Sequence, residues 1–268
     1  MINVCRFGYG VLLAVLAAVF VQVATADTIL CYQVFGGSRA ESMQIMLRPN
    51  AIRIEGAALG PRFKWLLYKR TEDVLFAVSP AQKEVLVLDA AGVDYIRRNM
   101  RARRVRLQQE MEQMPSWKRK FLESQVGHLL EQREIGAVIS HVEMKGDTAW
   151  IADVECQVGD IIAAGLQVGA LCLASADTLG LANSAFDSYR RMYRLINGLE
   201  RAMASGASDP EAPAMSELDG VPLFIVLDAS GVVQILQRLI QQPLSDDKFE
   251  IPASYKQQEP QDLLEQVP

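Results

Sequence analysis

The strongest constraint on the fold is a long region in which apolar and polar side chains alternate with a period of two, between residues 28 and 89. Segments 43–47 and 52–54 each have one apolar face, and Pro49 and Asn50 separate them as a turn. Further short apolar runs cover 63–68, 74–78 and 85–88. Because no helix alternates with these runs, the pattern predicts a meander of antiparallel strands.

The period changes to that of a helix between residues 94 and 134, with Pro115-Ser116 as a break. Beyond the break, one side of a helical wheel is apolar and contains Trp117, Phe121, Leu122, Val126, Leu129 and Leu130. Residues 184–203 predict a second amphipathic helix, and strands resume at 138–144, 148–158, 167–174, 221–227 and 232–239. The order indicates an α+β fold in which a mostly antiparallel sheet is covered on one face.

The N-terminus has the pattern of a secretory signal peptide over residues 1–26. It has an early Arg6, an apolar run over 11–21, and the small residues Ala24 and Ala26 at the expected cleavage site. Eleven apolar residues are too few to cross a bilayer core of about 30 Å. We therefore expect cleavage near Ala26 and a mature protein that is periplasmic or secreted.

Export makes disulfide bonds chemically permitted, and three cysteines remain once Cys5 leaves with the signal. Cys156 and Cys172 lie symmetrically about a turn at 163–165, so a hairpin centred there places them opposite one another. This spacing predicts a Cys156–Cys172 disulfide, with two buried free thiols as the alternative. Cys31 is then a small buried apolar residue.

Composition limits the function more by exclusion than by assignment. The chain has 268 residues, 50% of them hydrophobic, and a net charge of -5, which excludes a disordered chain and argues against nucleic acid as a partner. No nucleophile, phosphate-binding or zinc-protease motif is present, and His128 and His141 lack further metal ligands. Asp153 and Glu155 are typical of a solvated strand face. The sequence predicts a non-enzyme without metal or cofactor.

The one unusual electrostatic feature is a run of six arginines within residues 97–106. Residues 97–120 carry nine cations and two acids, whereas the rest of the mature chain is acidic. The run predicts a contact surface for an anionic membrane or an acidic protein partner, with a solvated helix face as the alternative. The side chains concerned are Arg97, Arg98, Arg101, Arg103, Arg104 and Arg106.

The paired strands at 43–47 and 52–54, the run 84–89, the later cysteine hairpin and the closing stretch 247–256 follow one another in a familiar order. This order resembles the periplasmic superfamily of lipoprotein-localisation factors (LolA/LolB-like), and an exported family within it. The resemblance implies an incomplete antiparallel barrel whose apolar concave face is plugged by helices and receives acyl chains. We expect a single domain of this kind over 27–256, followed by a flexible tail over 257–268. The sequence departs from the superfamily by a basic helical insertion at about 94–135.

A ligand site follows if the sheet is a half-open barrel of this kind. Ile45, Ile54, Trp65 and Phe76 lie on adjacent strands and are expected to converge on the concave face. The first hypothesis is then a carrier or sensor of a hydrophobic or acylated small molecule or lipid. The second is a non-enzymatic interaction or structural protein that fills its cavity and acts through the basic helix. An open cavity favours the first hypothesis, and a packed interior favours the second.

Overall fold

The structure is a computed structural model that describes residues 26–36, 39–56, 59, 62–119, 140–203, 213–228 and 231–265. The predicted signal peptide, apart from Ala26, and the apolar stripe from Phe121 to Leu130 lie outside the described residues. No helix within the described ranges is both long enough and apolar enough to cross a membrane.

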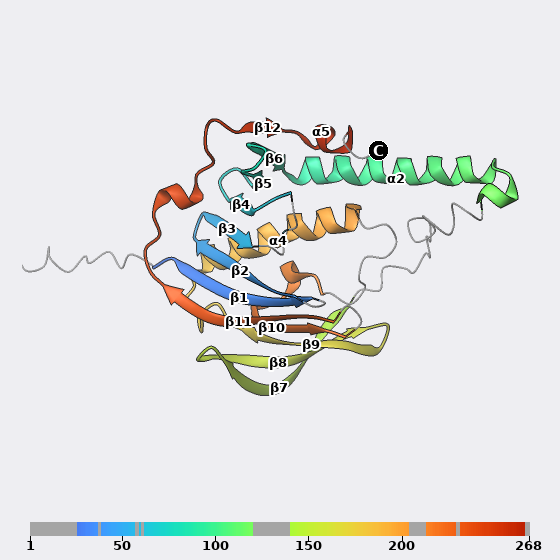
Figure 1. Cartoon of the computed structure of the whole chain (residues 1–268). Helices are drawn as coiled ribbons and strands as arrows, with labels where there is room; N and C mark the ends of the chain where they lie inside the picture. Colours follow the sequence, from blue (N-terminus) through green and yellow to red (C-terminus); the bar gives the residue numbers. More distant parts are fainter. Residues whose placement is uncertain are drawn as a thin grey trace, which may run out of the picture.

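One open sheet of 12 strands forms the body of the molecule (Figure 1). Its strands follow the order β12-β6-β5-β4-β3-β2-β1-β11-β10-β9-β8-β7, so β12 and β7 are the two edges. The first half of the chain contributes β1 (Thr28–Gly36), β2 (Arg39–Arg48), β3 (Ala51–Gly56), β4 (Trp65–Lys69), β5 (Val74–Ser79) and β6 (Glu84–Leu88). The second half contributes β7 (His141–Ile151), β8 (Val154–Ala163), β9 (Leu166–Ala174), β10 (Val221–Leu227), β11 (Val232–Gln241) and β12 (Lys256–Gln258). Every pairing is antiparallel except that of β12 with β6, which confirms the mostly antiparallel sheet.

Two tight turns set the hairpins of the second half. Ala164 and Gly165 join β8 to β9 with φ values of 52° and 77°, the left-handed conformation that a two-residue hairpin turn requires. Ala152 and Asp153 join β7 to β8 in the same way, with φ values of 50° and 61°. The sequence prediction of one strand over 148–158 was wrong because neither residue carries the glycine signal of such a turn.

Two long helices accompany the sheet, α2 (Ala90–Glu112) and α4 (Asn183–Met203). In α4, Ala185, Tyr189, Met192 and Leu195 are buried at spacings of three and four, and the helix contacts β2, β3 and β5. The second predicted helix is thereby confirmed. Figure 1 shows α2 beside α4 at its start and extending away from the sheet over its C-terminal half. Shorter elements complete the fold: η2 (Met215–Glu217), η3 (Asp246–Phe249) and α5 (Pro260–Glu265).

The main core lies between α4 and one face of the sheet. Leu30, Ile52 and Leu75 from the strands meet Ile96 of α2 and Met192 of α4 in this core. A separate cluster covers the opposite face of β1 to β6, which we call the outer face, and contains Trp65, Leu67, Phe76 and Phe249. The segment 242–256 lies over this outer face through Leu244, Phe249, Ile251 and Tyr255. The sheet is therefore covered on both faces in this half, not on one face as the sequence predicted.

The C-terminal segment is structured where the sequence predicted a flexible tail. Lys256–Gln258 pairs with β6 as β12, and Gln258 is only 4% exposed. In α5, Pro260 packs so closely on Gly92 that a Cβ there would come within 2.7 Å of its Cγ. Residues 257–265 of the predicted tail thus include part of β12 and the helix α5, and Gln258 and Pro260 are buried. The basic helix also begins at Ala90, earlier than the predicted boundary of 94.

Candidate binding surface

The four predicted ligand-binding residues do not share one face of the sheet. Ile45 pairs with Ile54, and Ile54 pairs with Leu66, so these three side chains lie on the face toward α4. Trp65 and Phe76 belong to the cluster on the outer face. The expected convergence is wrong because successive side chains of a strand point to opposite faces, and the prediction was one residue out of register in β4 and β5.

The interior beside Ile45 and Ile54 is filled by the protein's own side chains. Tyr189 and Met192 of α4 are fully buried there, and the Tyr189 and Tyr193 rings lie 4.7 Å apart between centroids. The hydroxyl of Tyr32 donates a hydrogen bond to the carbonyl oxygen of Pro222 at 3.0 Å. Burial raises the pKa of Tyr32 and Tyr189 well above the usual value and raises the pKa of Tyr193 to about 12. These phenols are neutral packing groups at physiological pH.

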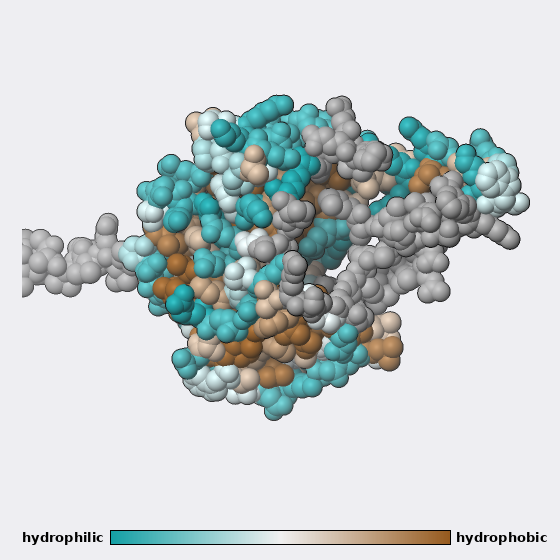
Figure 2. Space-filling model, viewed as in Figure 1, coloured by the Kyte–Doolittle hydropathy of each residue, from teal (hydrophilic) through white to brown (hydrophobic). Residues whose placement is uncertain are grey.

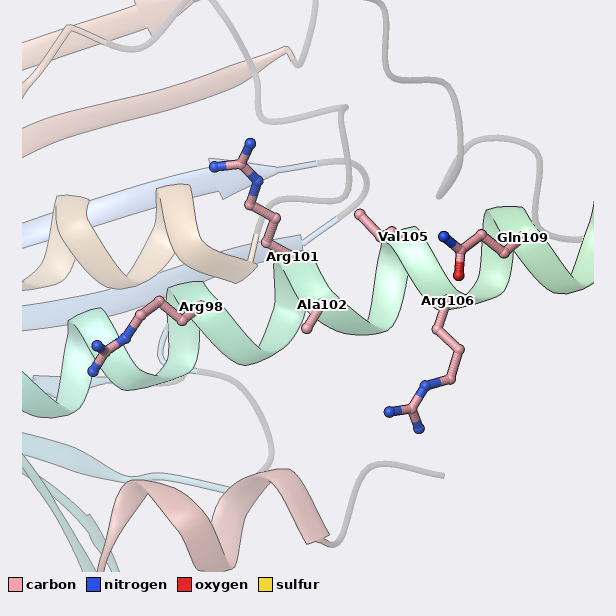
Figure 3. A pocket seen from close by; sticks show the side chains of 6 residues that line it. All are labelled: Arg98, Arg101, Ala102, Val105, Arg106 and Gln109. Atoms are coloured by element: carbon pink, nitrogen blue, oxygen red, sulfur yellow. The ribbon is translucent and has the colours of Figure 1, made fainter.

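Two hollows on the surface of the described residues are candidates for a binding site, and no residue of the core beneath α4 lines either of them. One, of about 410 Å³, lies on the outer face and is lined by Ser42, Gln44, Glu55, Gly56, Lys64 and Trp65. The other, of about 450 Å³, runs along α2 and is lined by Arg98, Arg101, Ala102, Val105, Arg106 and Gln109 (Figure 3). The second hollow lies within the arginine run, so it is the stronger candidate site.

The N-terminal part of α2 is held firmly by the body of the protein. Asp89 caps the helix, because its Oδ1 accepts a hydrogen bond from the Gly92 N–H at 2.6 Å. Gly92, Val93 and Ile96 are buried against α4, α5 and β6. This base fixes the direction in which the rest of the helix leaves the sheet.

The remainder of α2, residues 97–112, is mostly exposed, and we call it the arm. It carries six arginines and two glutamates. Arg97 forms an ion pair with Asp94 at 2.8 Å. Arg103 and Arg104 each have an interaction partner as well. Within the described part of the chain, Arg98, Arg101 and Arg106 make no ion pair. The structure thus places all six predicted arginines on one projecting helix and, among the described residues, leaves three of them free of an ion pair.

The end of the arm is closed by a cationic cap. The Arg119 guanidinium donates to the carbonyl oxygens of Met111, Glu112 and Met114 at 3.1, 3.2 and 3.4 Å. Trp117, which the sequence placed on an apolar packing stripe, is instead 73% exposed beside this cap. The arm therefore keeps its helical form to its end without support from the sheet.

Sequence reasoning found the arginines but missed the small side chains between them. Ala102 and Val105 lie in the hollow among the three arginines that line it, and Val105 is exposed. Figure 2 shows the arm as mostly hydrophilic, with little apolar surface among its polar side chains. The signal that could have identified them is the spacing of residues 98, 102, 105 and 109, which places them in one line on a helix.

The predicted disulfide is confirmed, and its position in the hairpin differs from the prediction. Cys156 and Cys172 are bonded, with their Cα atoms 5.5 Å apart. Cys172 is paired across the strands with Val158, not with Cys156. The two-residue turn pairs Ala163 with Leu166, which displaces the predicted register by one residue, and the shift between Ile161 and Ile162 displaces it by one more. The two cysteines are diagonal neighbours on one face, still within reach of each other. Cys31 is a free thiol packed against the outer cluster.

The histidine and acidic candidates are not brought together. His141 is exposed and lies 3.1 Å from Glu143 between Nε2 and Oε1, while His128 lies outside the described residues. Asp153 is a turn residue and Glu155 is on β8, so they do not form the strand pair that the sequence suggested. Among the residues that the structure describes, no group of three or more His, Cys, Asp or Glu side chains could hold a metal ion.

A half-buried arginine at the rim of the outer face was also missed by the sequence analysis. Arg48 bonds Asp27 at 2.9 Å, Asp246 at 2.7 Å and the Leu244 carbonyl oxygen at 2.6 Å, and it stacks on the Phe249 ring. The hydrogen bond with Asp27 is the main cause that raises the pKa of Arg48. These contacts fasten the segment 242–256 to the sheet, so they are structural and do not contribute to the arm.

Comparison with known proteins gives no family for this chain. No family model matches it, and no curated protein matches it. Among solved structures, a conserved protein from Thermus thermophilus is similar with a TM-score of 0.41 and 8% identity, over 88% of this chain and 91% of that one.

The complex of MucA and MucB from Pseudomonas aeruginosa is similar with a TM-score of 0.38 and 11% identity, over 86% of this chain and 57% of the matched chain. A structure of PNGF-II is similar with a TM-score of 0.41 and 8% identity, over 90% of this chain and 33% of that one. The chain therefore spans only part of the last two proteins. TM-scores this low support no statement about fold family, partner or activity.

Proposed function

We propose that this chain is a non-enzymatic binding protein that presents the arm of α2 to an anionic partner. The observation that carries the proposal is the combination of a rigid base and a projecting helix with accessible cations. Three arginines, Arg98, Arg101 and Arg106, line the hollow of about 450 Å³ on this helix. The rest of the chain is acidic, so the cations are concentrated on one projecting element.

The arginine run is costly for the helix itself. Like charges three or four residues apart destabilise a helix by about 0.2–0.5 kcal/mol per pair, and Arg97 with Arg101, Arg98 with Arg101, and Arg101 with Arg104 have this spacing. The ion pair of Arg97 with Asp94 offsets part of this repulsion. A helix face that only needed to be soluble would mix both signs of charge. The excess of one sign therefore supports a role in attracting an anionic surface.

The carrier or sensor hypothesis requires an apolar cavity that a ligand can enter. Ile45 and Ile54 face the core that α4 packs against, and Trp65 and Phe76 are buried in the outer cluster together with Phe249. Trp65 also lines the hollow of about 410 Å³ on the outer face, but the other residues that line it are Gly56 and polar or charged side chains, which do not suit an acyl chain. We therefore rank the filled-cavity interaction protein above the carrier of a hydrophobic or acylated ligand. Membership of the LolA/LolB-like superfamily stays a prediction.

Export remains part of the proposal. The predicted signal peptide and the Cys156–Cys172 disulfide support an oxidising compartment such as the periplasm. In that compartment, the partners open to the arm are anionic lipid surfaces and acidic proteins.

The test compares two triple variants that remove the same charge. Arg98→Gln, Arg101→Gln and Arg106→Gln empty the hollow of cations, whereas Lys64→Gln, Arg238→Gln and Lys256→Gln remove three exposed cations of the body. Binding to immobilised poly-glutamate and to phosphatidylglycerol vesicles is measured at about 20 and 150 mM salt.

We expect the arm variant to lose at least about tenfold in affinity for one of these two probes, and the body variant to lose less than about threefold. Equal losses in the two variants would reject the arm as the binding surface. A titration with a fluorescent fatty acid is run on the same wild-type protein. Saturable binding there would favour the carrier hypothesis instead.

A further inference from the structure

The exposed side of the arm has the spacing of a helix-packing seam. Arg98, Ala102, Val105 and Gln109 follow one another at intervals of four, three and four residues, the intervals of core positions in paired helices. Two more arginines, Arg101 and Arg106, lie in the same hollow. On the helix they flank this line on its two sides, at positions that select the charge of a partner helix in such pairs.

We propose that the arm docks an acidic amphipathic helix of a partner protein along this seam, an inference that rests on the proposed binding function. Ala102 has a small side chain and lets another helix approach closely, and Val105 gives it an apolar contact. Arg101 and Arg106 then meet carboxylates that flank the apolar stripe of the incoming helix.

The side of α2 that the protein itself uses is different. Val93 and Ile96 are buried at its base and continue along the helix as Met100 and Leu107, at spacings of three, four and seven. The seam residues lie on the other side of the helical wheel. The seam is therefore free of the contacts that hold α2 to α4, and an incoming helix does not need to displace them.

Shape and composition favour a helix over a membrane on this side. A helix that lies on a bilayer buries a face of large side chains such as Trp, Phe and Leu, whereas the apolar residues that line the hollow are Ala102 and Val105. The described residues that line the hollow all belong to α2, so it is an open groove along one helix, a shape into which the side chains of a second helix can pack. Trp117 lies beyond the end of α2 and is not part of the seam.

The experiment uses the full mature chain and two labelled synthetic peptides of about 21 residues. Both have alanine and leucine at the two core positions of each heptad, and one has glutamate and the other lysine at the flanking positions. Fluorescence anisotropy gives the affinity, and binding to phosphatidylglycerol vesicles is measured in parallel. The variants are Ala102→Gln, which fills the seam without changing charge, and Arg97→Gln, which removes an arginine that pairs with Asp94 and does not line the hollow.

We expect the glutamate peptide to bind and the lysine peptide not to bind. Ala102→Gln should lower the affinity for the glutamate peptide at least about tenfold and leave the affinity for vesicles within about twofold. Arg97→Gln should change the affinity for the glutamate peptide less than about threefold. Vesicle binding without peptide binding, or peptide binding that Ala102→Gln leaves intact, would overturn the seam while the proposed binding function stands. If the wild-type protein binds neither poly-glutamate, nor the glutamate peptide, nor the vesicles, both the seam and the proposed binding function are overturned.

Discussion

The two ends of the sheet are built from the same kind of hairpin and are stabilised in different ways. Strands β3 to β6 have buried side chains on both faces, and the segment 242–256 covers the outer one. At the other end, β7 is exposed at most of its positions, and a disulfide ties β8 to β9. Near the exposed edge strand β7, the disulfide between β8 and β9 supplies stability that packing on both faces supplies at the other end of the sheet.

This difference also places the binding surface. The arm leaves the molecule from the doubly covered end, where Asp89, α4 and α5 hold its base. A projecting helix can keep its direction only if its base resists bending, and a lightly covered edge would not supply that resistance.

The largest effect is expected from Trp65 at the doubly covered end. Trp65 is 8% exposed and stacks against the Arg53 guanidinium, with 4.0 Å between Cζ and the ring centroid. Trp65→Ala should lower the free energy of unfolding by about 3–5 kcal/mol, because it removes a large buried side chain from the outer cluster. Urea denaturation measures the loss, and Trp65→Phe should lose less. A loss below about 1 kcal/mol would show that the outer cluster contributes little.

The disulfide should matter nearly as much at the other end. Replacing Cys156 and Cys172 together by alanine opens a loop with a sequence separation of 16. The chain-entropy model predicts a loss of about 3 kcal/mol. The matched control is Cys31→Ala, which removes a free thiol and should cost about 1 kcal/mol or less. Equal losses in the two variants would mean that β8 and β9 are held by packing alone.

The cover over the outer face depends on Arg48. Arg48→Gln removes the ion pairs with Asp27 and Asp246 and leaves Asp27, whose side chain is 11% exposed, without its cation. We expect a loss of about 2 kcal/mol and faster proteolysis within 242–256. Arg238→Gln, at an exposed position, is the control and should change stability by less than about 0.5 kcal/mol. Unchanged proteolysis in Arg48→Gln would show that apolar contacts alone hold the segment.

Tyr32 of β1 and Tyr189 and Tyr193 of α4 lie in the main core between the sheet and α4. The stability that these tyrosines contribute should depend on alkaline pH. The folded protein raises the pKa of Tyr193 to about 12, whereas an unfolded tyrosine titrates near 10. The neutral phenol is favoured in the fold, so its contribution is complete below about pH 10 and is lost as the pH rises toward 12. Tyr193→Phe should therefore lose less stability than wild type between about pH 10 and 12 in urea unfolding. Parallel losses would place the alkaline transition elsewhere.

Much of this architecture could be predicted from local pattern. Period-two runs identified β2, β3, β5 and β6, and helical spacing identified α4, because each pattern depends only on neighbouring residues. The facing of Trp65 and Phe76 was not predictable, since it depends on register and a shift of one residue exchanges the faces.

The same limit applies to the candidate site. Six arginines within ten residues are conspicuous in any sequence, so the charge of the arm was found. The direction of the arm depends on Pro260 of α5, which packs on Gly92 and lies about 150 residues further along the chain. The sequence around Pro260 is polar, so it was interpreted as a flexible tail. Contacts between segments so distant in sequence leave no local pattern that periodicity could detect.

The smallest effect is expected at Trp150, which completes the comparison with Trp65. Trp150 lies on the edge strand β7 and is 71% exposed, so its side chain has little buried area to lose. Trp150→Ala should change the free energy of unfolding by less than about 0.5 kcal/mol, roughly a tenth of the loss at Trp65. Urea denaturation of the two variants under one condition gives the ratio. A loss above about 2 kcal/mol at Trp150 would mean that the edge strand is covered in solution, and it would remove the contrast between the two ends of the sheet.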